Sequence, residues 1–404
     1  MFKFIKNNYR KFLCQRRYKK IITQLKLKER LRVIFLVTEN SKWCYQSLYD
    51  YMNKSDKFEA IVLISVLTSV HNKVDKTRNS LEDNYNFFKL RKINVDYAYS
   101  NGNYIDLKEF DPDIVFYEQP WDLPKIHKPI NVSKFALTCY CDYGLELVED
   151  KDNYKTNFHY LLYKFFVDNI NNISRYKDYI KGASNNCFAL GYPKLDVYHE
   201  NNNIKLENIW LEPQKIKIIY APHHSFENDG LQFATFKDNG HFMLEFAKLH
   251  PETTWVFKPH PRFKFALIKN NIMTEQEVDK YYDEWLKIGK ICTQGDYFDI
   301  FKTSDLMITD CCSFLGEYLP TLKPIIRLTK QNSMQLNNFG ETIVNACYQT
   351  FTKQDFINIY DKIIKDKKDY LLEKRLEIAS TMLDFNKKSS DKICKEILNE
   401  IGEI

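Results

Sequence analysis

Three segments in the second half of the chain carry side chains that are suited to binding phosphate groups. They are residues 220–225, 257–262 and 308–317, and each begins at the end of an apolar run typical of a buried strand. They offer imidazoles, positive charges, hydroxyls and carboxylates: His223, His224, Ser225, Lys258, His260, Arg262, Thr309, Asp310, Ser313 and Glu317. The carboxyl ends of parallel strands meet at one edge of a sheet, so we expect these groups to converge on one ligand. Basic groups and hydroxyls beside the first turn of a helix at Ser313 form an anion site, which suits a pyrophosphate.

Individual residues of this set have simpler alternatives. Residues 309–310 could cap the helix that follows them, and of the neighbours His223 and His224 only one is expected to face the ligand. His260 lies between two prolines, which hold it on a rigid loop and favour a functional role. Glu317 lies one turn into the expected helix, where its carboxylate can accept hydrogen bonds from ribose hydroxyls.

A second set of strand ends lies in the first half of the chain. The carboxyl ends at 39–43, 118–121 and 140–144 carry the candidate residues Glu39, Trp43, Glu118, Tyr140 and Asp142. Asp111 and Asp113 precede a strand and so lie at the wrong end of a sheet for a metal ion. The sequence therefore predicts no metal site. It also lacks the glycine-rich motifs of ATP-dependent and NAD-dependent enzymes.

Short apolar runs that alternate with helical segments predict two successive α/β units. The first has expected strands at 32–37, 60–67, 113–117 and 134–139, a helix at 42–52 and helices filling 155–181. After a polar linker at 197–213, strands are expected at 215–220, 253–258, 290–293, 305–309 and 323–327, and helices at 353–401. Such alternation is typical of parallel sheets with helices on both faces. We predict an α/β fold of GT-B type, in which two Rossmann-like domains, 31–200 and 201–404, face a cleft.

Residues 1–30 form a basic segment that differs from the rest of the chain. They contain eleven Lys or Arg and one acidic residue, a net charge of +10, while the whole chain carries +6. Apolar residues at three-to-four spacing predict an amphipathic helix that binds an anionic membrane surface. A helix packed on the body and a nucleic-acid-binding arm are the alternatives, but the mildly acidic remainder does not favour nucleic-acid binding. No run approaches the ~18 apolar residues of a spanning helix, so we expect a cytoplasmic protein, peripheral on the inner face of the membrane.

An ordered set of short motifs spans residues 191–327. It comprises Gly191-Tyr-Pro193 with Asp196, Tyr220-Ala-Pro222, His260-Pro261, Thr309-Asp310 with Ser313, and Lys323-Pro324. In this order the motifs resemble the CDP-glycerol glycerophosphotransferases, the family of teichoic-acid and capsule polymer enzymes. The chain departs from the family pattern at 223–225, where Thr-Trp-Arg is usual, and at Cys312, where a serine is usual. The family's His-Gly-Thr loop corresponds to residues 138–144, which contain no histidine.

The resemblance implies a transferase that moves glycerol-phosphate, or another polyol-phosphate, from a CDP-activated donor to a capsular or other cell-surface glycan precursor. The second unit would bind the nucleotide donor and the first unit the glycan or glycolipid acceptor, with no cofactor required. His260, with Arg262 and the helix start at Ser313, would stabilise charge on the phosphates and the departing CMP.

The missing histidine leaves the general base to Asp142 or to a tyrosine beside it. Asp142 is the expected base, which Glu39 or Glu118 could replace, because attack on phosphorus needs a proton acceptor within hydrogen-bond reach. Two other functions are alternatives: a GT-B glycosyltransferase that uses a nucleotide sugar, and a non-catalytic binding protein with a degenerate site.

Overall fold

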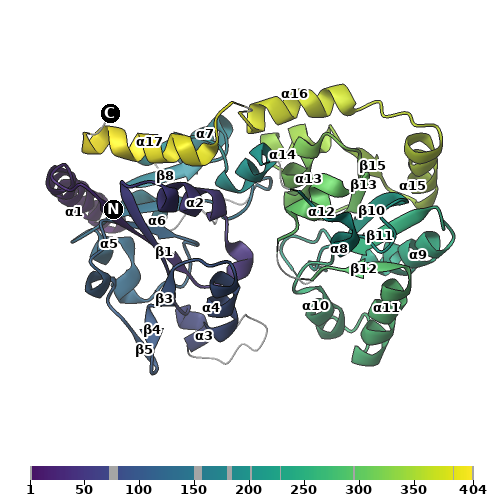
Figure 1. Ribbon diagram of the computed structural model, residues 1–404, viewed down its shortest axis with the longest axis horizontal. Helices are drawn as coiled ribbons and strands as arrows, with labels where there is room; N and C mark the ends of the chain where they lie inside the picture. The colour runs from purple at the N-terminus through teal and green to yellow at the C-terminus, as the bar shows by residue number, and fades with distance from the viewer. Residues whose placement is uncertain are drawn as a thin grey trace. The chain divides into compact units, whose positions relative to one another are not determined.

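The alternating pattern of the sequence produces two parallel sheets, each in its own unit (Figure 1). The computed structural model describes residues 2–71, 81–149, 157–179, 184–200, 203–227, 229–293, 296–384 and 386–402. The first unit comprises residues 1–145, 150–199 and 382–404, and the second comprises 146–149 and 200–381.

The first unit is built on a seven-stranded sheet in which all neighbours are parallel. In spatial order its strands are β3 (Val95–Tyr97), β2 (Phe58–Ile64), β1 (Leu31–Val37), β6 (Ile114–Tyr117), β7 (Leu137–Cys141), β8 (Lys164–Val167) and β9 (Cys187–Ala189). The central strands β6 and β7 are buried at every residue, because helices cover both faces of the sheet. The helices of this unit are α1 (Phe2–Leu25), α2 (Gln46–Lys54), α3 (Thr68–His71), α4 (Leu81–Leu90), α5 (Pro129–Val132), α6 (Asn157–Leu161), α7 (Ile170–Tyr179) and α17 (Ser389–Ile401). A separate antiparallel pair joins β4 (Tyr99–Ser100) to β5 (Asn103–Tyr104).

The second unit has a six-stranded parallel sheet with the same doubly covered character. In spatial order its strands are β12 (Gly289–Ile291), β11 (Thr253–Phe257), β10 (Ile216–Ala221), β13 (Leu306–Thr309), β14 (Ile325–Leu328) and β15 (Tyr348–Thr350). Its helices are α8 (Leu206–Ile209), α9 (Phe236–Lys248), α10 (Phe263–Lys269), α11 (Glu275–Ile288), α12 (Phe298–Thr303), α13 (Cys312–Tyr318), α14 (Asn338–Val344), α15 (Lys353–Tyr360) and α16 (Leu372–Met382). An aromatic core packs against β10 and β11, and in it Trp285 is stacked on Phe257, with the ring centroids 5.1 Å apart.

Helix α17 corrects the expected domain boundary, because it belongs to the first unit and not to a domain 201–404. The buried carboxylate of Asp196 accepts hydrogen bonds from the backbone amides of Ser389 at 2.7 Å and Ser390 at 2.9 Å. It also accepts a bond from the hydroxyl of Ser47 on α2, at 3.0 Å. Close packing at this joint explains Gly191, which has a φ of +95° and where a Cβ would lie 2.3 Å from the Ser389 hydroxyl oxygen.

The expected helical stretch 155–181 is interrupted by a strand. Residues 155–156 and 180–181 lie outside the described residues, and between α6 and α7 the chain forms β8. The strand places Lys164 inside the fold, where its ammonium bonds to Glu396 at 2.6 Å and to Glu400 at 2.7 Å. These two partners lie on α17, so the sequence around the strand does not reveal how the buried charge is satisfied.

Helix α1 forms as predicted, but half of its apolar stripe packs on the first unit. Cys14, Tyr18, Ile21 and Leu25 are buried, and the Tyr18 hydroxyl donates to the carbonyl of Leu161 at 2.8 Å. This is the alternative of a helix packed on the body, realised over residues 14–25. None of the described helices is long and apolar enough to cross a membrane.

Candidate active site

Three histidines lie together at the carboxyl ends of β10 and β11. The amide of His260 donates to the carbonyl of Pro222 at 3.1 Å and so joins the loops that follow the two strands. The rings of His224 and His260 are stacked, with centroids 3.9 Å apart. The ring of His223 lies 4.5 Å from that of His224 and 5.3 Å from that of His260. The structure thus gathers all three histidines, whereas only one of the neighbours 223 and 224 was expected to face the site.

Backbone amides determine which ring nitrogen of two of these histidines carries the proton. Nδ1 of His223 lies 3.2 Å from the amide nitrogen of Ser225, and Nδ1 of His260 lies 3.1 Å from that of Arg262. A backbone N–H can only donate, so both Nδ1 atoms accept and the proton of the neutral ring is on Nε2. His223 and His260 therefore present N–H donors from Nε2.

Burial keeps the imidazoles neutral. It lowers the pKa of His224 to about 4 and the pKa values of His223 and His260 well below their usual range, with a further lowering from neighbouring histidines at the last two. Ring nitrogens of the three residues lie within 4.8 Å of one another, which is close enough for a shared ligand. A metal ion would need unprotonated nitrogens, so the N–H donors at His223 and His260 match an anion better than a cation.

Positive charge beside the imidazoles comes from Lys258 and Arg262. Lys258 follows β11 and is buried, with its ammonium nitrogen 5.4 Å from the ring centroid of Tyr297 and 5.7 Å from that of Phe314. Arg262 is exposed directly before α10, and both cations lower the pKa of His260. This edge of the sheet combines neutral donors with fixed positive charge, which is the chemistry of a phosphate site.

Three predicted phosphate ligands instead position the histidine loop. Asp310 is buried, and it accepts hydrogen bonds from the amides of His223 at 2.6 Å and Thr235 at 2.7 Å. The buried Thr309 hydroxyl donates to the carbonyl of Ala221 at 2.7 Å. The buried Ser225 hydroxyl lies 2.7 Å from Nδ1 of His223. Their side chains are engaged within the protein, so we correct their role from ligand contact to positioning; Asp310 also does not cap a helix.

Ser313 and Glu317 lie on the short helix α13. Ser313 is half-buried in its first turn. Glu317 is buried and accepts a hydrogen bond from the hydroxyl of Tyr297, a residue that the sequence analysis did not select. Tyr297 precedes α12 as one aromatic residue among several, so the sequence holds no signal for this pairing.

In the first unit, Glu118 holds the loop that follows β1. Its Oε2 accepts hydrogen bonds from the amides of Thr38 at 2.9 Å and Glu39 at 3.0 Å, and from the Thr38 hydroxyl at 2.9 Å. Its Oε1 is buried and has no hydrogen-bond partner. Burial raises the pKa of Glu118 to about 7, against the lowering effect of Lys42 and these hydrogen bonds.

Lys42, Trp121 and Tyr143 lie within the strand ends 39–43, 118–121 and 140–144 that the sequence pointed to, although they were not named as acceptor-side residues, and the structure places them together at this edge. The ammonium of Lys42 lies 5.7 Å from the ring centroid of Trp121 and 5.4 Å from that of Tyr143. It also pairs with Glu39 at 3.3 Å. Asp142 directly follows β7 and is 8% exposed. The signal that could have found these residues is a lysine and two aromatics directly after three strand ends.

Trp43 and Tyr140 require correction, because both are core residues. Trp43 is buried against Phe88, with ring centroids 4.9 Å apart. Tyr140 is buried and stacked on Phe165 at 5.5 Å. Tyr140 is 1% exposed and Trp43 is 8% exposed, so both rings serve mainly in the core.

The two covered parallel sheets are Rossmann-like domains, and the chain has the α/β fold of GT-B type. The family model described as CDP-glycerol:poly(glycerophosphate) glycerophosphotransferase matches residues 24–399. The chain therefore belongs to this family, and it is a transferase of the CDP-glycerol glycerophosphotransferase type. The resemblance seen over residues 191–327 extends through nearly the whole sequence.

Solved structures share the fold at low sequence identity. A putative UDP-N-acetylglucosamine 2-epimerase from Listeria monocytogenes has a TM-score of 0.62 and 13% identity, covering 93% of this chain and 98% of that one. A variant of the wall teichoic acid polymerase TagF has a TM-score of 0.61 and 14% identity, covering 99% and 98%. UDP-GlcNAc 2-epimerase from Neisseria meningitidis, bound to UDP-GlcNAc, has a TM-score of 0.57 and 13% identity, covering 92% and 100%. No curated protein matches the sequence.

Proposed function

We propose that the enzyme transfers glycerol-phosphate, or another polyol-phosphate, from a CDP-activated donor to a hydroxyl of a cell-surface glycan precursor such as a capsular polymer. The observation that carries the proposal is the cluster of His223, His224 and His260 beside Lys258 and Arg262. Neutral N–H donors and fixed positive charge together suit a diphosphate, whose oxygens need both hydrogen bonds and charge compensation.

In the proposed reaction an acceptor hydroxyl attacks the phosphorus that bears the polyol. A new P–O bond forms to the acceptor, the P–O bond to the CMP phosphate breaks, and CMP leaves with that electron pair. The hydroxyl proton goes to a carboxylate, for which Asp142 is the proposed base. It is more exposed than Glu118, whose Oε2 holds the loop after β1, while Glu39 is paired with Lys42. Lys258, Arg262 and His260 stabilise the charge on CMP as it departs.

Acceptor binding is assigned to the carboxyl edge of the first unit's sheet. Trp121 and Tyr143 offer aromatic faces, and Lys42 between them offers a positive charge. Aromatic faces suit the C–H surface of a sugar or polyol, and the ammonium suits a phosphate on the acceptor. This assignment replaces Trp43 and Tyr140 as acceptor-side residues.

Ligand-induced thermal stabilisation tests the donor assignment. Saturation at about 100 times the dissociation constant should add about 2.7 kcal/mol to the free energy of unfolding. We expect stabilisation by CDP-glycerol, CDP-ribitol or CMP that is lost in His260→Ala and kept in the control His241→Ala, an exposed histidine of the same unit. Stabilisation by UDP- or GDP-sugars alone, with release of a nucleoside diphosphate, would instead identify a glycosyltransferase. Binding of cytidine ligands without turnover on any candidate acceptor would favour a non-catalytic protein.

Attachment to an anionic membrane on the cytoplasmic side is proposed through the outer stripe of α1. Tyr9 and Phe12 are 61% and 59% exposed, and Arg16 and Lys19 are exposed on the same side one to two turns further along. Exposed aromatics next to basic residues are typical of interfacial helices. We expect co-sedimentation with anionic vesicles that is reduced in a Tyr9→Ala/Phe12→Ala variant. The exposed Leu249 of the second unit provides the control Leu249→Ala. Equal vesicle binding by both variants would overturn the attachment.

A further inference from the structure

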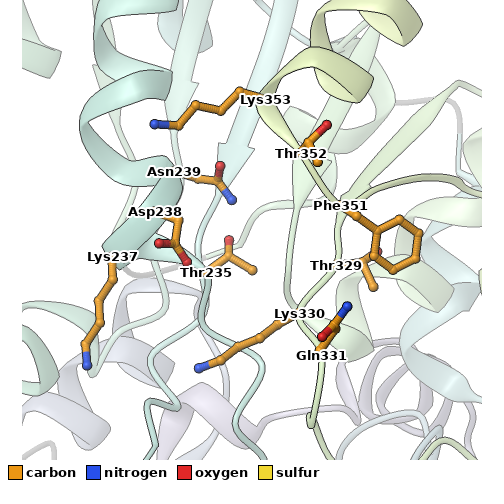
Figure 2. A pocket seen from close by; sticks show the side chains of 10 residues that line it. All are labelled: Thr235, Lys237, Asp238, Asn239, Thr329, Lys330, Gln331, Phe351, Thr352 and Lys353. Carbon is orange, nitrogen blue, oxygen red and sulfur yellow. The ribbon is translucent and has the colours of Figure 1, made fainter.

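A polar cavity of about 570 Å³ lies in the second unit, apart from the histidine cluster (Figure 2). It opens where β14 and β15 end, and its walls are residues 329–331, 351–353 and the start of α9. Its volume falls within the range of about 300–1,000 Å³ that is usual for small-ligand sites. Nothing in the proposed transfer of a polyol-phosphate uses this cavity.

Three lysines line the cavity, and two of them already hold an oxyanion. The ammonium of Lys237 bonds to Oε2 of Glu227 at 2.8 Å, and that of Lys330 bonds to Oε1 of the same carboxylate at 3.2 Å. The hydrogen bond from Lys237 is the main cause that lowers the pKa of Glu227 to about 2. A phosphodiester presents a comparable pair of negatively charged oxygens. The chain's own carboxylate thus marks a position at which these two ammonium groups donate to such a pair of oxygens.

The start of α9 adds to the attraction for anions. The hydroxyl of Thr235, the residue before α9, donates to Asp310 at 2.9 Å, so the first turn of this helix has no side-chain cap. The helix runs for 13 residues, and its positive end borders the cavity. Lys353 contributes a third ammonium from the start of α15 (Figure 2).

The remaining side chains are suited to hydroxyl groups and carbon chains. Asp238 and Asn239 line the cavity from α9, and Phe351 lines its opposite side, with the ring drawn away from them in Figure 2. A carboxylate repels a bare phosphate but accepts hydrogen bonds from hydroxyls, and the amides of Asn239 and Gln331 can both donate and accept. Phe351 is 61% exposed and offers an aromatic face to C–H groups. The cavity therefore matches a ligand that carries both hydroxyls and negative charge.

We propose that this cavity binds a segment of an anionic polyol-phosphate polymer, in which hydroxylated carbons alternate with phosphodiesters. The lysines take the phosphodiester oxygens, while Asp238 and Asn239 take the hydroxyls and Phe351 the carbon chain. This inference rests on the proposed function, since such a polymer is the acceptor or product of polyol-phosphate transfer. The cavity holds the polymer on the unit that binds the donor, and Glu227 competes with it for Lys237 and Lys330.

Isothermal titration calorimetry with a synthetic glycerol-phosphate trimer tests the inference. We expect binding by the full-length protein that weakens at least tenfold in Lys330→Gln/Lys353→Gln and severalfold in Phe351→Ala. Glu227→Gln removes the competing carboxylate and should strengthen binding severalfold. The control is Lys248→Gln: Lys248 lies on α9 like Lys237 and is paired with glutamates, Glu245 at 3.0 Å and Glu284 at 2.9 Å, as Lys237 and Lys330 are, but it does not line the cavity. Equal affinity in the double variant and in this control would overturn the site.

Two further measurements are needed. Competition experiments identify the chemistry of the ligand, and a comparison of trimer binding with cytidine-ligand binding tests the cavity and the proposed donor separately. Inorganic phosphate should compete at least tenfold less well than the trimer, and neutral glycerol should not compete; equal competition by phosphate would overturn the polyol part of the inference. Binding of CDP-glycerol without binding of the trimer would overturn the polymer cavity alone. Binding of the trimer without any cytidine ligand would overturn the proposed donor and leave the cavity supported, and binding of neither would overturn both.

Discussion

The carboxyl edges of the two sheets have the same backbone architecture but opposite proton chemistry. In the second unit the edge carries imidazoles that burial keeps neutral, and it lowers the pKa of His224 to about 4. In the first unit the edge carries carboxylates, and burial raises the pKa of Glu118 to about 7. Burial disfavours the charged form at both edges, so it raises the pKa of a carboxyl group and lowers the pKa of an imidazole. The same fold thus presents neutral N–H groups at one edge and carboxylates at the other.

The largest effect is expected when the proposed proton acceptor of the first unit, Asp142, is replaced. Asp142→Asn should lower turnover by about 100- to 10,000-fold, because an amide cannot take the proton of the attacking hydroxyl. Binding of CDP-glycerol to the second unit should persist. CMP release under saturating donor measures the effect, with Asp178→Asn, an exposed aspartate on α7 of the same unit, as the control. Full turnover in Asp142→Asn, combined with loss in Glu118→Gln, would move the base to Glu118.

In the second unit, the largest effect is expected when His260 is replaced. His260→Ala should lower CMP release by about 100- to 1,000-fold, because one preorganised N–H donor to developing charge is lost. Single-turnover rates measure this, and His241→Ala is the control. A variant within threefold of the wild-type rate would show that the imidazole has no part in stabilising the phosphates.

The pH dependence of stability sharpens the contrast for Glu118. A carboxyl whose pKa is raised in the folded state binds its proton more tightly there, so its contribution to stability falls as the pH rises from about 4.5 to about 7. A pKa shift of this size corresponds to a loss in the free energy of unfolding on the order of 3 kcal/mol across that pH range. Glu118→Gln keeps a carbonyl oxygen for the Thr38 and Glu39 amides but cannot ionise, so its stability should fall less between pH 5 and pH 8. Urea unfolding at the two pH values measures the difference. Identical losses in variant and wild type would contradict the assignment.

The smallest expected effect concerns the imidazoles. With pKa values far below neutrality, they stay uncharged above pH 5, so titration of the cluster should change the affinity for CMP by less than about threefold between pH 6 and pH 8. Nitrogen NMR of the histidines should show the proton on Nε2 of His223 and His260. A tenfold gain in affinity at pH 6 that disappears in His260→Ala would mean that the cluster binds phosphate as imidazolium.

The second unit was the more predictable one from sequence. Its apolar runs end in loops rich in imidazole and positive charge, and parallel pairing brings such loops to one edge. What the sequence did not reveal is which polar groups the protein uses internally. Asp310 bonds to amides at positions 223 and 235, and no local pattern encodes partners so distant.

The first unit was harder because its signals are weaker and its partners lie further away. Tyr140 lies in a strand buried on both faces, so alternation cannot tell an inward ring from one that faces a ligand. Strand β8 was mistaken for helix because Lys164 reads as a surface residue until its partners on α17 are known. Lys42, Trp121 and Tyr143 come from three separate segments, and only the folded sheet places them together.

The tie between Asp196 and Ser389–Ser390 has a consequence for the order in which the chain folds during synthesis. The first unit needs α17, yet the ribosome makes the whole second unit before it makes that helix. Domains generally fold as units, amino-terminal first, as the chain emerges. Here the later unit can finish while the earlier one still lacks a helix and the glutamates that neutralise the buried Lys164. A stop codon placed before Ser389 would therefore damage the first unit, at the far end of the sequence, and leave the second unit whole.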